Sequence, residues 1–322
     1  MNIKGIHHLS AMTGNAPGNY SFYTDVLGMR LIKKTVNQDD TSTYHLFYGD
    51  ERGNPGTELT FFDFPGIPRG VPGINSISGT SLRVPSDAAL AYWMKRFDER
   101  GVKHSGITGH AGREVIFFED PEGQPLSLVS DERNSGVAGG KPWDRSPVPA
   151  EYGITGLGPV KLTVRRPEGT LAALRLLGFK EIARVPALAE GQEDLIILQA
   201  GDGGSGAEVQ VEPRSDLPAA RQGYGGVHHV AFRVDDKEEL MAWIDILNRA
   251  GLPNSGFVER YYFRSLYFRE PGGILFELAT DGPGFDTDEP FETLGESLAL
   301  PPFLEPQRAS IEAKLKPLHT KR

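Results

Sequence analysis

Short apolar runs recur four times along the chain at roughly equal spacing, about 70–80 residues apart. They have the composition of β-strands and lie at residues 9–12, 80–84, 160–164 and 230–234. A polar turn follows each run, and then a stretch whose apolar residues have helical spacing, as in residues 20–27. The pattern predicts an internal repeat that begins with one strand and one helix.

A glycine ends each predicted helix, at a position where a left-handed C-terminal cap is expected. These glycines are Gly28, Gly101, Gly178 and Gly251. Further strand-like runs come next, at residues 44–48, 115–118, 195–198 and 266–268, and Pro–Gly-type turns follow three of them. The repeat is therefore predicted as a βαβββ module of an α+β fold, present at about residues 3–64, 74–131, 153–213 and 224–281.

The modules divide the chain into two halves and a tail. Residues 131–152 are rich in Gly, Pro, Ser and charge, which is typical of a linker. We therefore expect an N-terminal domain at residues 1–140 and a C-terminal domain at 141–281. The module pattern stops there, and residues 282–322 form a tail whose leucines favour packing on the body over a frayed extension.

Composition narrows the classes of function. The chain of 322 residues has no Cys, so a reducing compartment is expected and any metal has only nitrogen and oxygen ligands. Lys+Arg 34 against Asp+Glu 43 gives a net charge of −9 without a basic block, which argues against a nucleic-acid partner. No signal core or membrane-length apolar run is present, so we expect a cytoplasmic protein that does not span a membrane.

Histidine and glutamate residues on predicted strands indicate one metal site. His229 and Glu277 lie on two strands of the fourth module, and His8 takes the place of His229 in the first module. The corresponding positions elsewhere hold no such ligands: Gly79, Pro159, Ser127 and, approximately, Phe61. Two imidazoles and one carboxylate leave coordination positions open, an arrangement typical of non-haem Fe(II) oxygenases. The site can form only if module 1 lies beside module 4, which pairs module 2 with module 3.

Each metal-ligand histidine has a histidine directly before it. Because side chains alternate along a strand, His7 and His228 are expected to start on the opposite side from His8 and His229. Near a strand end such a neighbour can still reach the pocket rim. We interpret His7 and His228 as residues that support the metal ligands or contact the substrate, with ordinary exposed histidines as the alternative.

Several segments together resemble the vicinal oxygen chelate superfamily, which includes glyoxalases, bleomycin resistance proteins and extradiol dioxygenases. These segments are residues 7–9, 22–29, 228–232 and 268–277, and the likeness extends over nearly the whole chain, including residues 298–305. Within the superfamily the chain is similar to the hydroquinone-cleaving branch of ring dioxygenases. The resemblance implies that the modules form two open barrels of curved sheet. It also implies that His8, His229 and Glu277 bind Fe(II), with Mn(II) as a second option.

The resemblance also implies roles for residues near the metal. Extradiol enzymes of this superfamily carry a pocket tyrosine ten residues before the metal-binding glutamate, which is the offset of Tyr267 from Glu277. Arg260 is expected to hold the charge of a hydroquinone anion or of a developing oxygen anion. Its alternative is a surface ion pair, for example with Glu259. Proton transfer requires a His or Tyr, and the candidates are His228, Tyr267 and His7.

The implied activity is O₂-dependent cleavage of a small aromatic diol, and three alternatives stay open. A glyoxalase-like isomerase or thiol transferase would need a fourth protein ligand, for which Glu58 is the candidate. The second is catechol cleavage, in which adjacent hydroxyls chelate the iron. The third is a drug-binding resistance protein, although three ligands around open positions favour an enzyme. Homo-oligomerisation is open as well.

The remaining candidates have weaker signals. Lone histidines are more often structural or exposed than catalytic, so four are left outside the predicted site: His45, His104, His110 and His319. Phe263 and Phe276 are interpreted as core residues that could line the pocket. The glycine-containing segment 201–206 lacks the context of a phosphate-binding loop and is predicted to be a hairpin tip.

Overall fold

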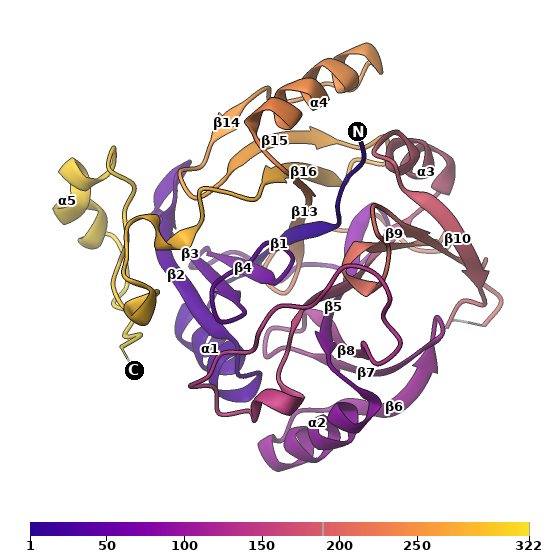
Figure 1. The fold of residues 1–322 in the computed structure, drawn as a ribbon, viewed down its shortest axis with the longest axis horizontal. Coiled ribbons are helices and arrows are strands. Elements are labelled where there is room, and N and C mark those ends of the chain that lie inside the picture. Colours follow the sequence, from indigo (N-terminus) through magenta and orange to yellow (C-terminus); the bar gives the residue numbers. More distant parts are fainter. Residues whose placement is uncertain (189, 322) are drawn as a thin grey trace.

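The computed structural model describes residues 1–188 and 190–321, and it contains four βαβββ modules (Figure 1). The first module comprises β1 (Ile6–Thr13), α1 (Ala16–Ser21), a π-helical turn (Phe22–Val26), β2 (Arg30–Asn37), β3 (Asp40–Gly49) and β4 (Glu58–Asp63). The second comprises β5 (Ser76–Val84), α2 (Asp87–Arg100), β6 (His104–His110), β7 (Arg113–Glu119) and β8 (Pro125–Ser130).

The second half of the chain repeats this order. The third module comprises β9 (Gly156–Val164), α3 (Pro167–Leu176), β10 (Lys180–Val185), β11 (Leu195–Gln199) and β12 (Glu208–Pro213). The fourth comprises β13 (Val227–Val234), α4 (Lys237–Arg249), β14 (Val258–Glu259), β15 (Arg264–Arg269) and β16 (Leu275–Thr280). The predicted stop of the second helix is observed, because α2 ends at Gly101 with a φ of 69°.

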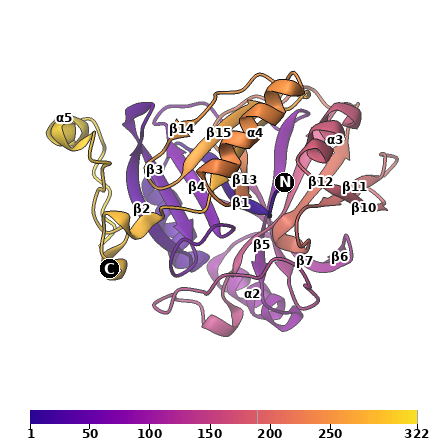
Figure 2. The same cartoon turned by 45° about the horizontal axis from the view of Figure 1, so that its top comes forward.

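The modules combine into two curved eight-stranded sheets. One sheet has the order β14-β15-β16-β13-β1-β4-β3-β2, and the other β10-β11-β12-β9-β5-β8-β7-β6. Strands β1 and β13 join module 1 to module 4, and β5 and β9 join module 2 to module 3; both pairs are antiparallel. The predicted α+β fold, its two open half-barrels and its module pairing are thus confirmed. Helices α2, α3 and α4 lie on the outside of the sheets (Figures 1 and 2).

The modules share a hydrophobic core between the sheets and their helices. Aromatic residues from the helices are fully buried there, among them Trp93 of α2 and Trp243 of α4. Alternate residues of the strands point to the opposite, concave face, which is polar in both sheets. In the first sheet this face carries His8, Ser10 and Thr60. The core therefore occupies one face of each sheet, and the other face is available for chemistry.

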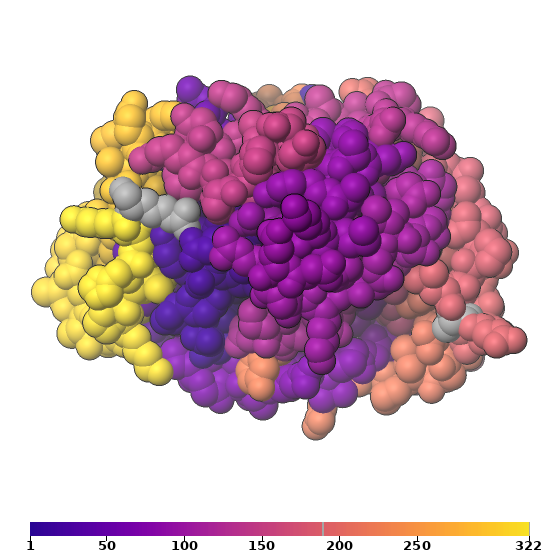
Figure 3. Space-filling model, turned by 90° about the horizontal axis from the view of Figure 1, so that it is seen from below, coloured from indigo at the N-terminus to yellow at the C-terminus, as the bar shows by residue number. Residues whose placement is uncertain are grey.

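The tail runs along the outer edge of module 1. A bridge from Leu298 to Lys34 extends the first sheet beyond β2. A small cluster of Val36 with three tail residues, Leu300, Leu304 and Ile311 of α5 (Arg308–Glu312), holds the segment in place. Figure 3 shows the tail surface lying directly against that of module 1. The tail therefore covers a sheet edge that would otherwise be unpaired.

A second tail segment packs under the concave face of the first sheet. The ammonium group of Lys33, fully buried on β2, donates to Asp288 at 2.7 Å and to Glu289 at 2.5 Å. Asp288 also accepts a hydrogen bond from Tyr262, at 2.8 Å. Because Tyr262 lines the same half-barrel as Lys33, the tail holds one wall of this half-barrel in place.

Within the described residues, no helix has both the length and the apolar character needed to cross a bilayer.

Substitution of Ile311 by Ala should loosen the tail. Ile311 is 1% exposed, and truncating such a side chain typically costs about 2–5 kcal/mol, here confined to the tail cluster. We expect faster limited proteolysis within residues 282–322 and a lower melting temperature. Phe303→Ala is the matched control, because Phe303 is 56% exposed and should change stability by no more than about 0.5 kcal/mol. Equal proteolysis of the two variants would contradict the role given to the cluster.

Candidate metal centre

Two β-bulges in the pairing of β1 with β13 shape the candidate metal centre. The register passes from Ile6↔Phe232 to His8↔Ala231, which leaves His7 as an extra residue on β1. It then passes from Ser10↔His229 to Ala11↔Val227, which leaves His228 as an extra residue on β13. A bulge re-aims the side chain of its extra residue. Simple alternation is therefore wrong here: His7 turns toward His8, and His228 turns toward His229, instead of away from them.

The hydrogen bonds of His7 determine the tautomer of His8. His7 Nε2 lies 3.1 Å from the carbonyl oxygen of Thr280, which can only accept, so Nε2 carries the proton. Burial lowers the pKa of His7 to about 3, so the ring is neutral and its Nδ1 is an acceptor. His8 Nδ1 lies 3.0 Å from that atom and must donate to it. The Nε2 atom of His8 consequently presents a lone pair, as a metal ligand requires.

His229 has a matching partner on the other bulge. Its Nδ1 lies 2.8 Å from Nδ1 of His228, and burial lowers the pKa of His228 to about 3, so that ring is neutral too. The Nε2 atoms of His8 and His229 are 3.3 Å apart. Two imidazoles from opposite ends of the chain thus meet on neighbouring strands.

Glu277 completes the cluster. Its Oε2 lies 2.8 Å from Nε2 of His229 and 3.2 Å from Nε2 of His8, and Ser265 donates to its Oε1 at 2.5 Å. Burial alone would raise the pKa of Glu277, but the imidazoles of His8 and His229 beside its carboxylate hold the pKa well below the ordinary value. The group is therefore a carboxylate although its residue is fully buried.

A metal cation fits this cluster. His8, His229 and Glu277 each offer one ligand atom, and these atoms lie within 4.8 Å of one another. Oε2 of Glu277 is buried and has no hydrogen-bond partner among the described residues. A buried charge without compensation is costly. Lone pairs that converge on an unpartnered carboxylate oxygen are what a divalent ion satisfies.

The cluster lies at the floor of a cavity of about 320 Å³ in the first half-barrel. Besides His8 and His229, module 1 contributes Ser10, Thr35, Val36, Asn37, Gln38, Asp39, His45, Phe47, Phe62 and Phe64, and module 4 contributes His228, Arg260, Tyr262, Phe263, Tyr267 and Leu275. The wall therefore combines aromatic rings with polar side chains, and such a combination is typical of a small-molecule site. Phe276, in contrast, is fully buried in the core and does not line the cavity.

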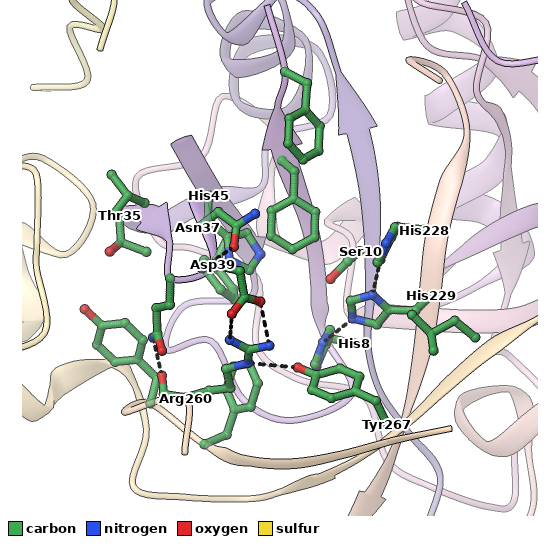
Figure 4. A pocket seen from close by; sticks show the side chains of 18 residues that line it. His8, Ser10, Thr35, Asn37, Asp39, His45, His228, His229, Arg260 and Tyr267 are labelled. Carbon is green, nitrogen blue, oxygen red and sulfur yellow. Dashed lines mark hydrogen bonds and ion pairs between the residues drawn. The ribbon is translucent and has the colours of Figure 1, made fainter. Parts of the chain in front are cut away.

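Arg260 joins the two walls of the cavity mouth (Figure 4). Its guanidinium donates to both carboxylate oxygens of Asp39, at 3.2 and 2.9 Å, and its Nε donates to the hydroxyl of Tyr267 at 3.2 Å. Gln38 donates to the carbonyl oxygen of Arg260 at 2.8 Å. The partner of Arg260 is therefore Asp39 on the β2–β3 hairpin. The sequence alternative, Glu259, pairs with Arg264 instead.

Glu58 does not join the metal cluster. Its Oε2 is buried 3.7 Å from Nδ1 of His7, and it groups with His7 and His8 rather than with His229 and Glu277. Burial raises the pKa of Glu58 well above the ordinary value, which disfavours the charged carboxylate that a metal ligand requires. The strand registers place Thr60, one residue from Phe61, at the position in module 1 that Glu277 has in module 4. In a glyoxalase-like site this position would hold a fourth metal ligand, but here it holds the hydroxyl of Thr60.

Sequence reasoning missed three side chains at this site: Ser265, Asp39 and His45. Ser265 lies two residues before Tyr267 on β15, and the strand alternation that placed Tyr267 in the cavity could have indicated it. Asp39 lies on a hairpin whose position depends on tertiary packing. His45 was left out as a lone histidine, although strand β3 carries it into the cavity.

Comparison with known proteins identifies the family. A match to the Glyoxalase/Bleomycin resistance protein/Dioxygenase superfamily covers residues 5–128 and 156–278. The chain belongs to this superfamily. It is 56% identical over 319 residues to the Bacillus subtilis protein MhqA, provisionally named a ring-cleaving dioxygenase, and the match covers 99% of this chain and 100% of the relative.

Other relatives extend this picture. A chlorohydroquinone/hydroquinone 1,2-dioxygenase of Sphingobium indicum is 30% identical over 307 residues, 94% of this chain and 93% of the relative. The crystal structure of a Bacillus subtilis protein, provisionally described as a dioxygenase, superposes with a TM-score of 0.89 at 35% identity and covers 100% of this chain and 99% of its own. Glyoxalase I of Zea mays, 16% identical with a TM-score of 0.63 over 86% of this chain and 92% of its own, shares the fold.

Replacement of Ser265 by Ala tests the support of Glu277. The variant loses the hydrogen bond that orients the carboxylate, and loss of such a partner typically weakens metal affinity by roughly 10–100-fold. Metal titration of the apoprotein, with circular dichroism to verify the fold, measures this. Ser127→Ala is the matched control, since Ser127 is the counterpart of Glu277 in the other half-barrel. Unchanged affinity in Ser265→Ala would contradict the assignment.

Proposed function

We propose that this chain is a non-haem Fe(II) ring-cleaving dioxygenase that acts on a hydroquinone with O₂. The observation that carries the proposal is the cluster of His8, His229 and Glu277, with its unpartnered buried carboxylate oxygen, at the floor of an aromatic cavity. Relatives named as ring-cleaving and hydroquinone dioxygenases support the reaction class. Two imidazoles and one carboxylate suit Fe(II), and Mn(II) accepts the same ligands.

The proposal assigns metal binding to His8, His229 and Glu277. A bound ferrous ion would supply the redox chemistry by which O₂ reacts with an aromatic diol. Both ring nitrogens of His7 are engaged, one with His8 and one with the carbonyl of Thr280, so we assign it to positioning rather than to proton transfer. Ser265 is likewise assigned to positioning, because its hydroxyl donates a hydrogen bond to the carboxylate of Glu277.

Tyr267 is the favoured proton donor. Its hydroxyl oxygen accepts from Arg260, which leaves its own proton free to be donated to a substrate oxygen in the cavity. Burial raises the pKa of Tyr267, so the phenol stays protonated at neutral pH. Arg260 supplies a positive charge where negative charge develops on oxygen. His228, a neutral imidazole that also lines the cavity, is the second candidate for proton transfer.

The phenylalanine side chains of the wall complete the proposed substrate site. Phe47, Phe62 and Phe263 offer flat apolar surfaces to an aromatic ring and exclude water from it. The glyoxalase-like alternative is less favoured because Thr60, a hydroxyl, stands at the place of a fourth ligand and Glu58 lies outside the cluster.

Metal analysis and oxygen uptake test the proposed function. Protein purified without added metal should contain iron near one atom per chain, and it should consume O₂ with a hydroquinone. Catechol and the methylglyoxal–glutathione adduct serve as comparison substrates. Conversion of the adduct without oxygen consumption would refute the proposal in favour of an isomerase. Glu277→Gln should lose iron while keeping its circular dichroism spectrum, and full activity in that variant would refute the ligand assignment.

Tyr267→Phe tests the proton donor. The variant should retain its metal and lose roughly 100-fold in kcat on hydroquinone, the lower range for general acid catalysis. Steady-state oxygen uptake and metal content measure the two effects. Tyr44→Phe is the control, because the Tyr44 hydroxyl donates to the carbonyl of Lys316 in the tail. Equal kcat in the two variants would show that the Tyr267 proton is not used.

A further inference from the structure

His45 lies on the wall of the cavity contributed by module 1. It projects from β3 toward the concave face, where its ring lies between those of Phe47 and Phe62, with centroids 4.0 and 4.2 Å away. The strand order places β4 between β1 and β3, so His45 is about 10 Å from β1 across the sheet, and the registers place it opposite Met12, four residues along β1 from His8. The imidazole is therefore fixed by aromatic packing at a distance from the metal ligands.

Only one nitrogen of His45 has a protein partner. Nε2 lies 2.9 Å from the hydroxyl of Thr60, which in turn lies 2.8 Å from the hydroxyl of Ser10. Nδ1 makes no hydrogen bond to the described residues. This short chain of hydroxyls fixes the ring plane together with the two phenylalanines. A polar nitrogen without a partner, on the wall of an aromatic cavity, is a group that a ligand can satisfy.

The ring of His45 is neutral, because burial lowers its pKa well below the ordinary value. A neutral imidazole has one donor and one acceptor nitrogen, and the bond to Thr60 is compatible with either tautomer. Nδ1 can therefore accept a hydrogen bond from a hydroxyl or donate one to it. Carboxylates and phosphates, which would favour a charged ring, fit this wall less well than a hydroxyl.

Para-diols and ortho-diols differ in where they place their second hydroxyl relative to the metal cluster and His45. Glu277 and its counterpart Thr60 mark opposite sides of the site, one in module 4 and one in module 1. A hydroquinone has its hydroxyls on opposite ring carbons, so an oxygen held beside Glu277 directs the other across the cavity. The hydroxyls of a catechol are adjacent, and both stay on the metal side.

We propose that Nδ1 of His45 binds the hydroxyl of a hydroquinone that points away from the metal, and so selects para-diols over catechols. The inference rests on the proposed function and adds to it a residue that determines specificity. Phe47 and Phe62 hold the imidazole, and Thr60 with Ser10 occupies its other nitrogen. The preference for para-diols then comes from one hydrogen bond, between Nδ1 of His45 and the hydroxyl that points away from the metal cluster.

Anaerobic binding tests this role without turnover. Hydroquinone, phenol and catechol are titrated by calorimetry into the Zn(II)-loaded wild type and the His45→Phe variant, which keeps an aromatic ring. The wild type should bind hydroquinone more tightly than phenol. In His45→Phe the Kd of hydroquinone should rise about tenfold, the usual worth of one hydrogen bond, and the Kd values of phenol and catechol should change less than twofold.

Two further variants serve as controls. His45→Gln keeps an amide that can donate and accept, and it should recover part of the hydroquinone affinity. His110→Gln removes an imidazole from the rim of the other half-barrel and should leave all three affinities unchanged. An equal loss for all three ligands would show that His45 only shapes the cavity, and this result would overturn the proposal.

Activity separates failure of this inference from failure of the proposed function. If the iron-loaded wild type cleaves hydroquinone and His45→Phe retains the wild-type discrimination in binding, only the role of His45 is refuted. Loss of turnover at unchanged hydroquinone affinity would also refute it, in favour of a proton-transfer role. If the wild type neither binds nor oxidises hydroquinone, the proposed function itself is refuted.

Discussion

The antiparallel pairing of β1 with β13 is the interaction on which the candidate site depends. It joins the first module to the fourth, and it places His8 and His229 on neighbouring strands although they are separated by most of the chain. The two bulges in this pairing then aim His7 at His8 and His228 at His229. Without this pairing, His8 and His229 would not meet beside Glu277. The hydrogen bond from His8 to His7, which sets the tautomer of His8, would also be lost.

The other half-barrel shows that the bulges are a property of the repeated fold, whereas the candidate metal site depends on which side chains occupy the bulged strands. The pairing of β5 with β9 has register shifts at corresponding points, one of them at Ser78, the counterpart of His7. Yet Gly79, Pro159 and Ser127 occupy the positions of His8, His229 and Glu277 there. The same backbone geometry therefore offers a metal site in one half-barrel and none at those positions in the other.

The walls of the cavity depend on segments that are distant in sequence. The β2–β3 hairpin meets module 4 through Asp39 and Arg260, so the mouth of the cavity is spanned by an ion pair. The tail reaches under the same half-barrel, where Asp288 binds both Lys33 and Tyr262. Each of these contacts ties a cavity-lining element to another part of the chain, which is how a site on open sheets is kept in one geometry.

The sequence by itself determined the modules and their pairing, because repeat spacing and strand alternation are local properties of the chain. It also predicted that His8, His229 and Glu277 converge, and the structure brings these three side chains together. It also indicated Tyr267 and Arg260 as neighbours of the cluster. It could not give the side-chain directions of His7 and His228, since a bulge arises only when two strands pair and their registers differ. Nor could it find Asp39 as the partner of Arg260, because this contact joins a hairpin of module 1 to module 4. It did not show His45 as part of the cavity either, since a lone histidine carries no signal of the concave face that its strand forms in the closed sheet. The tertiary structure decided them by closing the first sheet around β1 and β13, so that residues far apart in the chain share one concave face.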